Sequence, residues 1–114
     1  MEYIEKEKAE FYSENGYSGM DYPTIDKDIN FAVIKISTRS PKNGYQVNIG
    51  CKELLYIING SGILYLKKDT QEISFKQGDV IVIEKNECYA FDGNFEAAVS
   101  CTPALTSDQH KYIG

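Results

Sequence analysis

The sequence predicts an all-β domain, a sandwich or barrel built from about eight short strands. Apolar and β-branched runs recur at regular intervals, and no segment has the periodicity of a long helix. The clearest stretch is Gln46–Gly93, in which strand-like runs alternate with turn signals. With 114 residues and 42% hydrophobic side chains, the chain is long enough to bury one core.

The first half of the chain contains a polar segment followed by the first predicted strands. Residues 1–30 are charged and interrupted by glycines, so we expect an N-terminal arm and loop there. Phe31–Ser37 is a predicted strand that ends at the Ser40–Gly44 turn cluster. In the next strand, the alternation of side chains places Gln46 and Asn48 on one face.

The sequence of the second half of the chain predicts a hairpin, several further strands and a C-terminal tail. Glu53–Ile58 is expected to pair with Ile63–Lys67 across an Asn-Gly-Ser-Gly turn at 59–62. Polar turns at 68–71, 76–79 and 84–87 separate the remaining strands, which are Glu72–Phe75, Val80–Ile83, Tyr89–Phe91 and Phe95–Cys101. We therefore expect a β-barrel over residues 31–103 and a polar C-terminal tail over 104–114.

Composition excludes several classes of function. The net charge of −5 and the absence of a basic cluster argue against nucleic acid as a partner. No apolar run reaches the roughly 18 residues of a membrane span, and the charged N-terminus does not resemble a signal peptide. The three widely spaced cysteines, Cys51, Cys88 and Cys101, are expected to be reduced thiols. These features predict a cytoplasmic protein.

The spacing of residues from position 46 onward resembles the cupin family. Its first motif has two histidines separated by one residue, then a glutamate and a glycine. Here Glu53 precedes Gly60 by the interval of that motif, and Gln46 and Asn48 occupy the histidine positions. In the second motif, Gly78 matches the opening glycine, and Tyr89 stands in place of the histidine.

This resemblance implies a single-domain cupin, which is a double-stranded β-helix or jelly-roll barrel. Cupins hold their metal with three histidines and one glutamate, and this chain keeps only Glu53. Gln46 and Asn48 are uncharged, and Tyr89 is a poor ligand until it loses its proton near pH 10. We expect no metal and no cofactor. The only histidine, His110, is expected to be a solvated residue of the tail.

The same resemblance directs the side chains of Gln46, Asn48, Glu53 and Tyr89 into the barrel. They could form a polar floor that binds a small polar molecule, either a carbohydrate or a small organic acid. They could also form a buried network that satisfies its own hydrogen bonds. Phe91 could stack on a ligand ring or belong to the core. The leading hypothesis is a metal-free cupin that binds a small molecule through these five residues.

Two alternatives remain open from the sequence. Glu53 and Tyr89 could act as base and acid in a metal-independent sugar isomerase or epimerase. The chain could instead be a non-catalytic, dimerising regulatory module with a closed barrel. Small cupins commonly form homodimers, and the two-sided apolar stretch Glu53–Ile58 is consistent with that.

Overall fold

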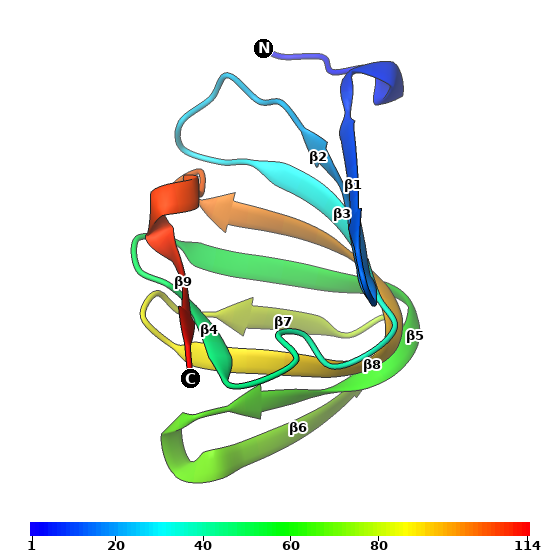
Figure 1. Cartoon of the computed structure of the whole chain (residues 1–114). Helices are drawn as coiled ribbons and strands as arrows, with labels where there is room; N and C mark the ends of the chain where they lie inside the picture. Colours follow the sequence, from blue (N-terminus) through cyan, green and yellow to red (C-terminus); the bar gives the residue numbers. More distant parts are fainter.

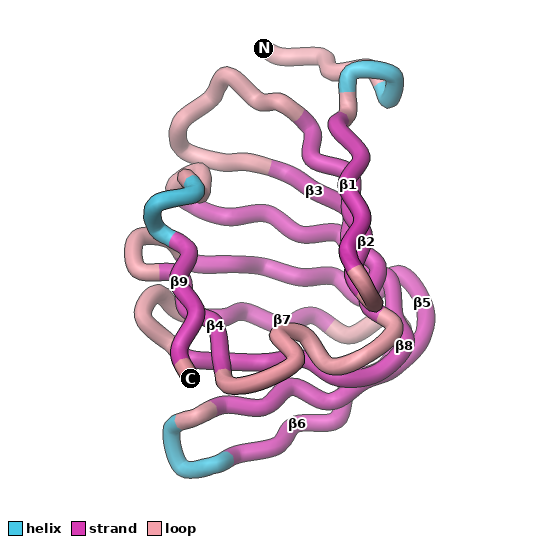
Figure 2. Tube along the Cα trace, viewed as in Figure 1, coloured by secondary structure: helices cyan, strands magenta, loops and turns pink.

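A computed structural model describes all residues, 1–114, and confirms the predicted all-β class. Nine strands form one curled sheet that wraps around an interior cavity (Figures 1 and 2). Three short 3-10 turns, η1 (Lys6–Lys8), η2 (Lys68–Thr70) and η3 (Ser107–Gln109), are the only helical pieces. The strands are β1 (Glu10–Glu14), β2 (Tyr17–Tyr22), β3 (Phe31–Ile36), β4 (Tyr45–Asn48), β5 (Lys52–Leu66), β6 (Gln71–Lys76), β7 (Val80–Ile83), β8 (Cys88–Thr102) and β9 (His110–Ile113).

The two longest strands, β5 and β8, form the centre of the sheet. They pair antiparallel along nearly their whole length, from Lys52–Thr102 to Leu66–Tyr89. The other edge of β8 pairs with β3 in its second half and with β4 at its start. The other edge of β5 pairs with β7 and then with β6. Four further strands, β3, β4, β6 and β7, pair directly with β5 or β8. The curvature of this central pair therefore determines the shape of the cavity.

The predicted hairpin across residues 59–62 is wrong, because β5 runs through that segment as one strand. The register shifts between Ile57 and Asn59, so the glycines there mark a bulge and a bend. The predicted break between the last two strands is wrong for the same reason, since β8 is also continuous. Gly62 and Gly93 pair directly at this bend, where the absence of side chains lets the two backbones approach. By contrast, the predicted turns at 68–71, 76–79 and 84–87 are confirmed.

Replacing Gly93 with Ala is expected to destabilise the fold by about 2 kcal/mol more than replacing Gly78 with Ala. Both glycines have positive φ, +139° and +90° respectively, so both variants carry backbone strain. A Cβ on Gly93 would lie 2.5 Å from the Cα of Gly62, whereas a Cβ on Gly78 meets nothing within 4 Å. Urea denaturation of the two variants measures this difference, and equal losses would contradict a tight bend at Gly93.

Both ends of the chain are part of the sheet, which the sequence interpretation did not anticipate. Within residues 1–30, β1 and β2 form a hairpin, and β2 pairs with β3. Within the predicted tail, β9 pairs with β4 from Tyr45–Ile113 to Asn48–His110. Although β9 has only 4 residues, it joins the sheet because the free edge of β4 has backbone groups that need hydrogen-bond partners. In Figure 1, β9 lies beside β4, on the opposite side of the curled sheet from β1.

The core lies on the concave side of the sheet. A cluster of 12 buried residues fills it, including Leu55, Ile57, Phe91 and Phe95. The alternation along β5 leaves Leu54, Tyr56 and Ile58 on the convex side, where they are exposed. No helix in the structure is long and apolar enough to cross a membrane.

Candidate ligand-binding cavity

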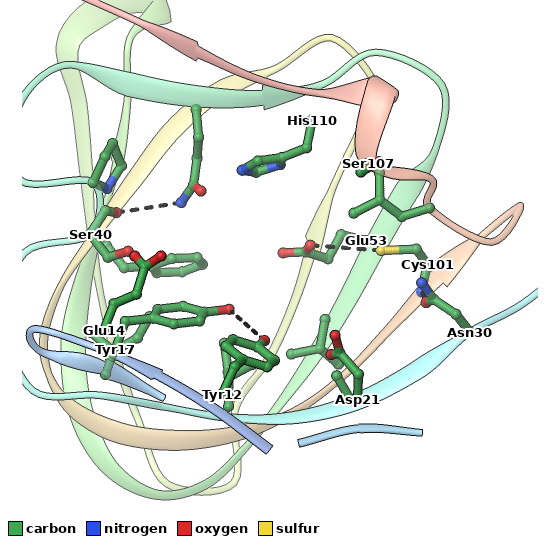
Figure 3. A pocket seen from close by; sticks show the side chains of 18 of the residues that line it. Tyr12, Glu14, Tyr17, Asp21, Asn30, Ser40, Glu53, Cys101, Ser107 and His110 are labelled. Carbon is green, nitrogen blue, oxygen red and sulfur yellow. Dashed lines mark hydrogen bonds between the residues drawn. The ribbon is translucent and has the colours of Figure 1, made fainter. Parts of the chain in front are cut away.

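The curled sheet partly encloses a cavity of about 810 Å³. Its wall combines aromatic rings with ionisable and amide side chains contributed by strands from both halves of the sequence. Figure 3 shows Tyr12, Tyr17 and Asp21 on one side of this space and Glu53 and His110 on the other. A cavity of this size accommodates a small organic molecule.

Glu53, Asn48 and Tyr89 form a buried polar cluster, in which Glu53 and Tyr89 line the cavity and Asn48, only 1% exposed, does not. Asn48 Nδ2 lies 3.4 Å from both Glu53 Oε1 and the Tyr89 hydroxyl. The Tyr89 hydroxyl donates to Glu53 Oε2 at 3.5 Å, and the Cys101 thiol approaches Glu53 Oε1 at 3.7 Å. The structure therefore brings three of the predicted site residues together.

Burial changes the acid–base properties of this cluster. Desolvation raises the pKa of Glu53, although hydrogen bonds from Asn48, Cys101 and Tyr89 act in the opposite direction. Desolvation and the nearby Glu53 charge also raise the pKa of Tyr89 well above its ordinary value. Tyr89 therefore keeps its proton at neutral pH and is available as a hydrogen-bond donor.

Gln46 and Phe91 also line the cavity, but at different depths. Gln46 pairs with Tyr89 across β4 and β8, and its amide donates to the Ser40 carbonyl at 3.4 Å. Phe91 is 2% exposed and packs edge-on against Phe75 and Tyr89, so most of its surface belongs to the core. A ligand can reach Gln46 more readily than it can reach the Phe91 ring.

The N-terminal hairpin supplies cavity residues that the sequence interpretation missed. The hydroxyls of Tyr12 and Tyr17 lie 3.4 Å apart, and their rings stack with centroids 5.9 Å apart. Asp21 also lines the cavity, and its burial and the nearby Glu10 raise its pKa. A signal for this hairpin was present, because Asn15-Gly16 between aromatic residues is a typical two-residue β-turn.

His110 is not a solvated tail residue, and that prediction is wrong. It lines the cavity, and its Nδ1 lies 2.7 Å from Asn48 Oδ1. Burial lowers the pKa of the imidazole. Among the cysteines, Cys101 lines the cavity, whereas Cys51 and Cys88 do not.

The side chains around Glu53 do not fit the metal site that cupins use. No group of three or more His, Cys, Asp or Glu side chains is positioned to hold a metal ion. Three groups approach the Glu53 carboxyl as hydrogen-bond donors, namely Asn48 Nδ2, the Tyr89 hydroxyl and the Cys101 thiol. A cation bound at this carboxyl would face those donors, so the cluster is built around hydrogen bonds.

Comparison with known proteins relates this fold to solved structures. Pac13 of Streptomyces, a nucleoside dehydratase solved with uridine, matches with a TM-score of 0.87 and 17% identity, over 99% of this chain and 90% of that one. The polyketide cyclase RemF of Streptomyces resistomycificus matches with a TM-score of 0.74 and 12% identity, over 100% and 86% of the two chains. KdgF from Halomonas sp. matches with a TM-score of 0.72 and 11% identity, over 95% and 97%.

The fold is a cupin-like β-barrel. No protein-family model matches the sequence, and no curated protein matches it either. At identities of 11% to 17%, these structures establish the shared fold only. The chemistry of the cavity has to be argued from the residues of this chain.

Proposed function

We propose that the cavity binds a small, neutral, polar molecule of the sugar or nucleoside class. The observation that carries this proposal is a cavity of about 810 Å³ whose wall includes the buried Glu53 and Tyr89. Ligand pockets typically have volumes of about 300–1,000 Å³ and place a few polar groups in a largely apolar wall. A purely regulatory module with a closed barrel would have no need of such a cavity.

The charges around the cavity favour a neutral ligand over an organic acid. Three carboxyl groups line it, those of Glu14, Asp21 and Glu53. Two cationic side chains, Arg39 and Lys42, also line it, and Arg39 already donates to the Pro41 carbonyl at 2.6 Å and lies over two tyrosine rings. A carboxylate ligand near Glu53 would meet a like charge, whereas a sugar hydroxyl can donate to Glu53 and accept from Tyr89.

The comparison with Pac13 supports including nucleosides in this class. That protein was solved with uridine, and its fold superposes over nearly the whole of this chain. A nucleoside combines a flat ring with a hydroxylated sugar. The stacked Tyr12 and Tyr17 rings and the Glu53 cluster offer complementary surfaces for these two parts.

Isothermal titration calorimetry with uridine, D-glucose and D-glucuronate tests this proposal. We expect saturable binding of uridine or glucose, with glucuronate at least about tenfold weaker than glucose because of its added charge. Tighter binding of glucuronate than of glucose would overturn the preference for a neutral ligand. Binding that is unchanged in Glu53→Gln would place the site elsewhere.

A second candidate function is acid–base catalysis on a carbonyl sugar, as in an isomerase or epimerase. The specific observation in its favour is the contact between Glu53 and Tyr89, two groups with raised pKa in one cavity. A raised carboxyl pKa suits a base that works near neutral pH, and a protonated phenol can stabilise a developing oxyanion. Incubation of ketoses with the protein in D₂O tests it, because enolisation incorporates deuterium beside the carbonyl.

We also propose that the chain forms a homodimer through the convex face of β5 and β7. Leu54 pairs with Val82 and Tyr56 with Val80 in this part of the sheet, and all four side chains are 45% to 60% exposed. A continuous apolar patch on a sheet face is typical of a protein interface. The double variant Val80→Lys/Val82→Lys is expected to be monomeric by light scattering. A wild-type mass of one chain at high concentration would contradict the proposal.

A further inference from the structure

His110 is the only histidine of the chain, and β9 places it in the cavity wall. It is opposite Asn48 in the β4–β9 register, so the pairing of two edge strands fixes its position. Its ring also packs edge-on against Tyr112, with centroids 5.1 Å apart. The imidazole is therefore held by its backbone, by a hydrogen bond and by a neighbouring ring.

The hydrogen bonds of Asn48 determine which nitrogen of His110 carries the proton. Asn48 Nδ2 faces Glu53 Oε1, and Asn48 Oδ1 faces His110 Nδ1 at 2.7 Å. Turning the amide over would place Oδ1 against the Glu53 carboxyl and the hydroxyl that Nδ2 now contacts. Since Asn48 Oδ1 can only accept, His110 Nδ1 must donate. A neutral imidazole then has its lone pair on Nε2.

His110 Nε2 has no hydrogen-bond partner in the protein and remains accessible. The only buried side-chain nitrogen or oxygen without a partner is Gln109 Oε1, so Nε2 is not sealed in the interior. No carboxylate contacts the ring directly, because Asn48 lies between it and Glu53. Burial lowers the imidazole pKa, which keeps the ring neutral at pH 7.

Glu53 is less available as a base than His110. Three donors approach its carboxyl, from Asn48, Tyr89 and Cys101, and only 9% of the residue is exposed. These contacts occupy three of the about four lone-pair sites of a carboxylate and fix its orientation. The arrangement Glu53–Asn48–His110 thus resembles a relay in which a carboxylate orients an amide and the amide orients an imidazole.

We propose that His110 is the proton acceptor of the cavity and that Asn48 is its positioning residue, for a sugar-like ligand with a C–H bond next to a carbonyl. This inference rests on the acid–base function proposed above and reassigns the base from Glu53 to His110. Nε2 takes the proton, and the C–H electron pair forms a carbon–carbon double bond. The π electron pair of the carbonyl moves onto the carbonyl oxygen, and the Tyr89 hydroxyl donates a hydrogen bond to this oxygen. Return of the proton to the same or the adjacent carbon completes an epimerisation or isomerisation without any co-reactant.

Nitrogen NMR of the single ¹⁵N-labelled histidine tests the inference directly. At pH 7 we expect Nδ1 to have the shift of a protonated ring nitrogen and Nε2 that of an unprotonated one. Asn48→Ala should lose this preference, whereas Gln46→Ala, on the same strand but bonded to Ser40, should keep it. An imidazolium at pH 7, a proton on Nε2, or an unchanged tautomer in Asn48→Ala would overturn the inference.

Deuterium exchange into D-xylulose, followed by proton NMR, provides the catalytic readout. His110→Gln is expected to lower the exchange rate about a hundredfold or more, because a positioned general base contributes about 10²–10⁴-fold. Exchange by wild type that persists in His110→Gln would overturn the assignment and leave the acid–base function standing. Absence of exchange in wild type would overturn the acid–base function and, with it, the role of His110 as proton acceptor.

Discussion

Glu53→Gln is expected to stabilise the protein at pH 7 and to weaken ligand binding about tenfold. The variant replaces a buried carboxyl, whose pKa is raised by desolvation, with a neutral group of the same shape. Binding weakens because a hydrogen bond to a charged group is worth about 1.5–3 kcal/mol, part of which the amide retains. Single stabilising substitutions commonly raise the free energy of unfolding by about 0.5–2 kcal/mol, and we expect a gain in this range.

The pH dependence of this effect follows from the direction of the pKa shift. The folded-state pKa of Glu53 lies above its ordinary value of 4.5, so the folded protein binds the proton more tightly than the unfolded chain. The unfolding free energy of wild type therefore falls as pH rises from 4.5 through the folded-state pKa, and Glu53→Gln lacks this decline. His110 acts in the opposite sense, because its lowered pKa costs stability as pH falls below 6.5.

Urea denaturation at pH 5 and pH 8 measures the prediction as a difference between wild type and Glu53→Gln. Glu72→Gln on β6 is the matched control, since that carboxyl is exposed and should show almost no difference. A Glu53→Gln protein that is less stable than wild type at pH 8 would mean that the ionised carboxyl stabilises the fold.

Phe91→Ala is expected to cost about 3–5 kcal/mol of stability, the range for removing a large buried aromatic side chain. Phe91 is 2% exposed and its ring contacts Phe75, Tyr89 and Phe95 at centroid distances of 5.5 to 6.0 Å. Its backbone also exchanges two hydrogen bonds with Ser40, which holds the 40–44 segment at the cavity. Total stabilities are about 5–15 kcal/mol, so this loss removes a large part of the margin.

Comparing the urea denaturation of Phe91→Ala with that of Phe11→Ala distinguishes the loss of core packing from the loss of a phenylalanine as such. Phe11 is 70% exposed on β1, and its removal should change stability by less than about 0.5 kcal/mol. If Phe91→Ala were nearly neutral while ligand binding was lost, Phe91 would be a binding residue, as the sequence suggested, more than a core residue.

The fold class was predictable because it depends on local patterns. Alternating apolar residues and turn signals identify strands, and the polar turns at 68–71, 76–79 and 84–87 were located correctly. The Gly60–Gly62 segment was interpreted as a hairpin because glycines mark turns and bends equally well. Only the pairing of Gly62 with Gly93 distinguishes the two cases, and that pairing joins distant parts of the chain.

The candidate site was predictable where the two motifs contained its residues. Asn48, Glu53 and Tyr89 lie close together, as the resemblance implied. His110 could not be located, because its position depends on a short strand at the C-terminus finding the free edge of β4. Tertiary pairing of this kind leaves only a weak local signal in the sequence.

The most direct test of the cavity as a binding site is a titration with uridine followed by ¹H–¹⁵N NMR. Our account predicts saturable shifts of amides around the cavity, including those of Asn48, Glu53, Tyr89 and His110, and weaker binding in Glu53→Gln. Shifts confined to the convex face of β5 and β7, or no shifts at millimolar uridine, would contradict the proposal that this cavity binds nucleosides.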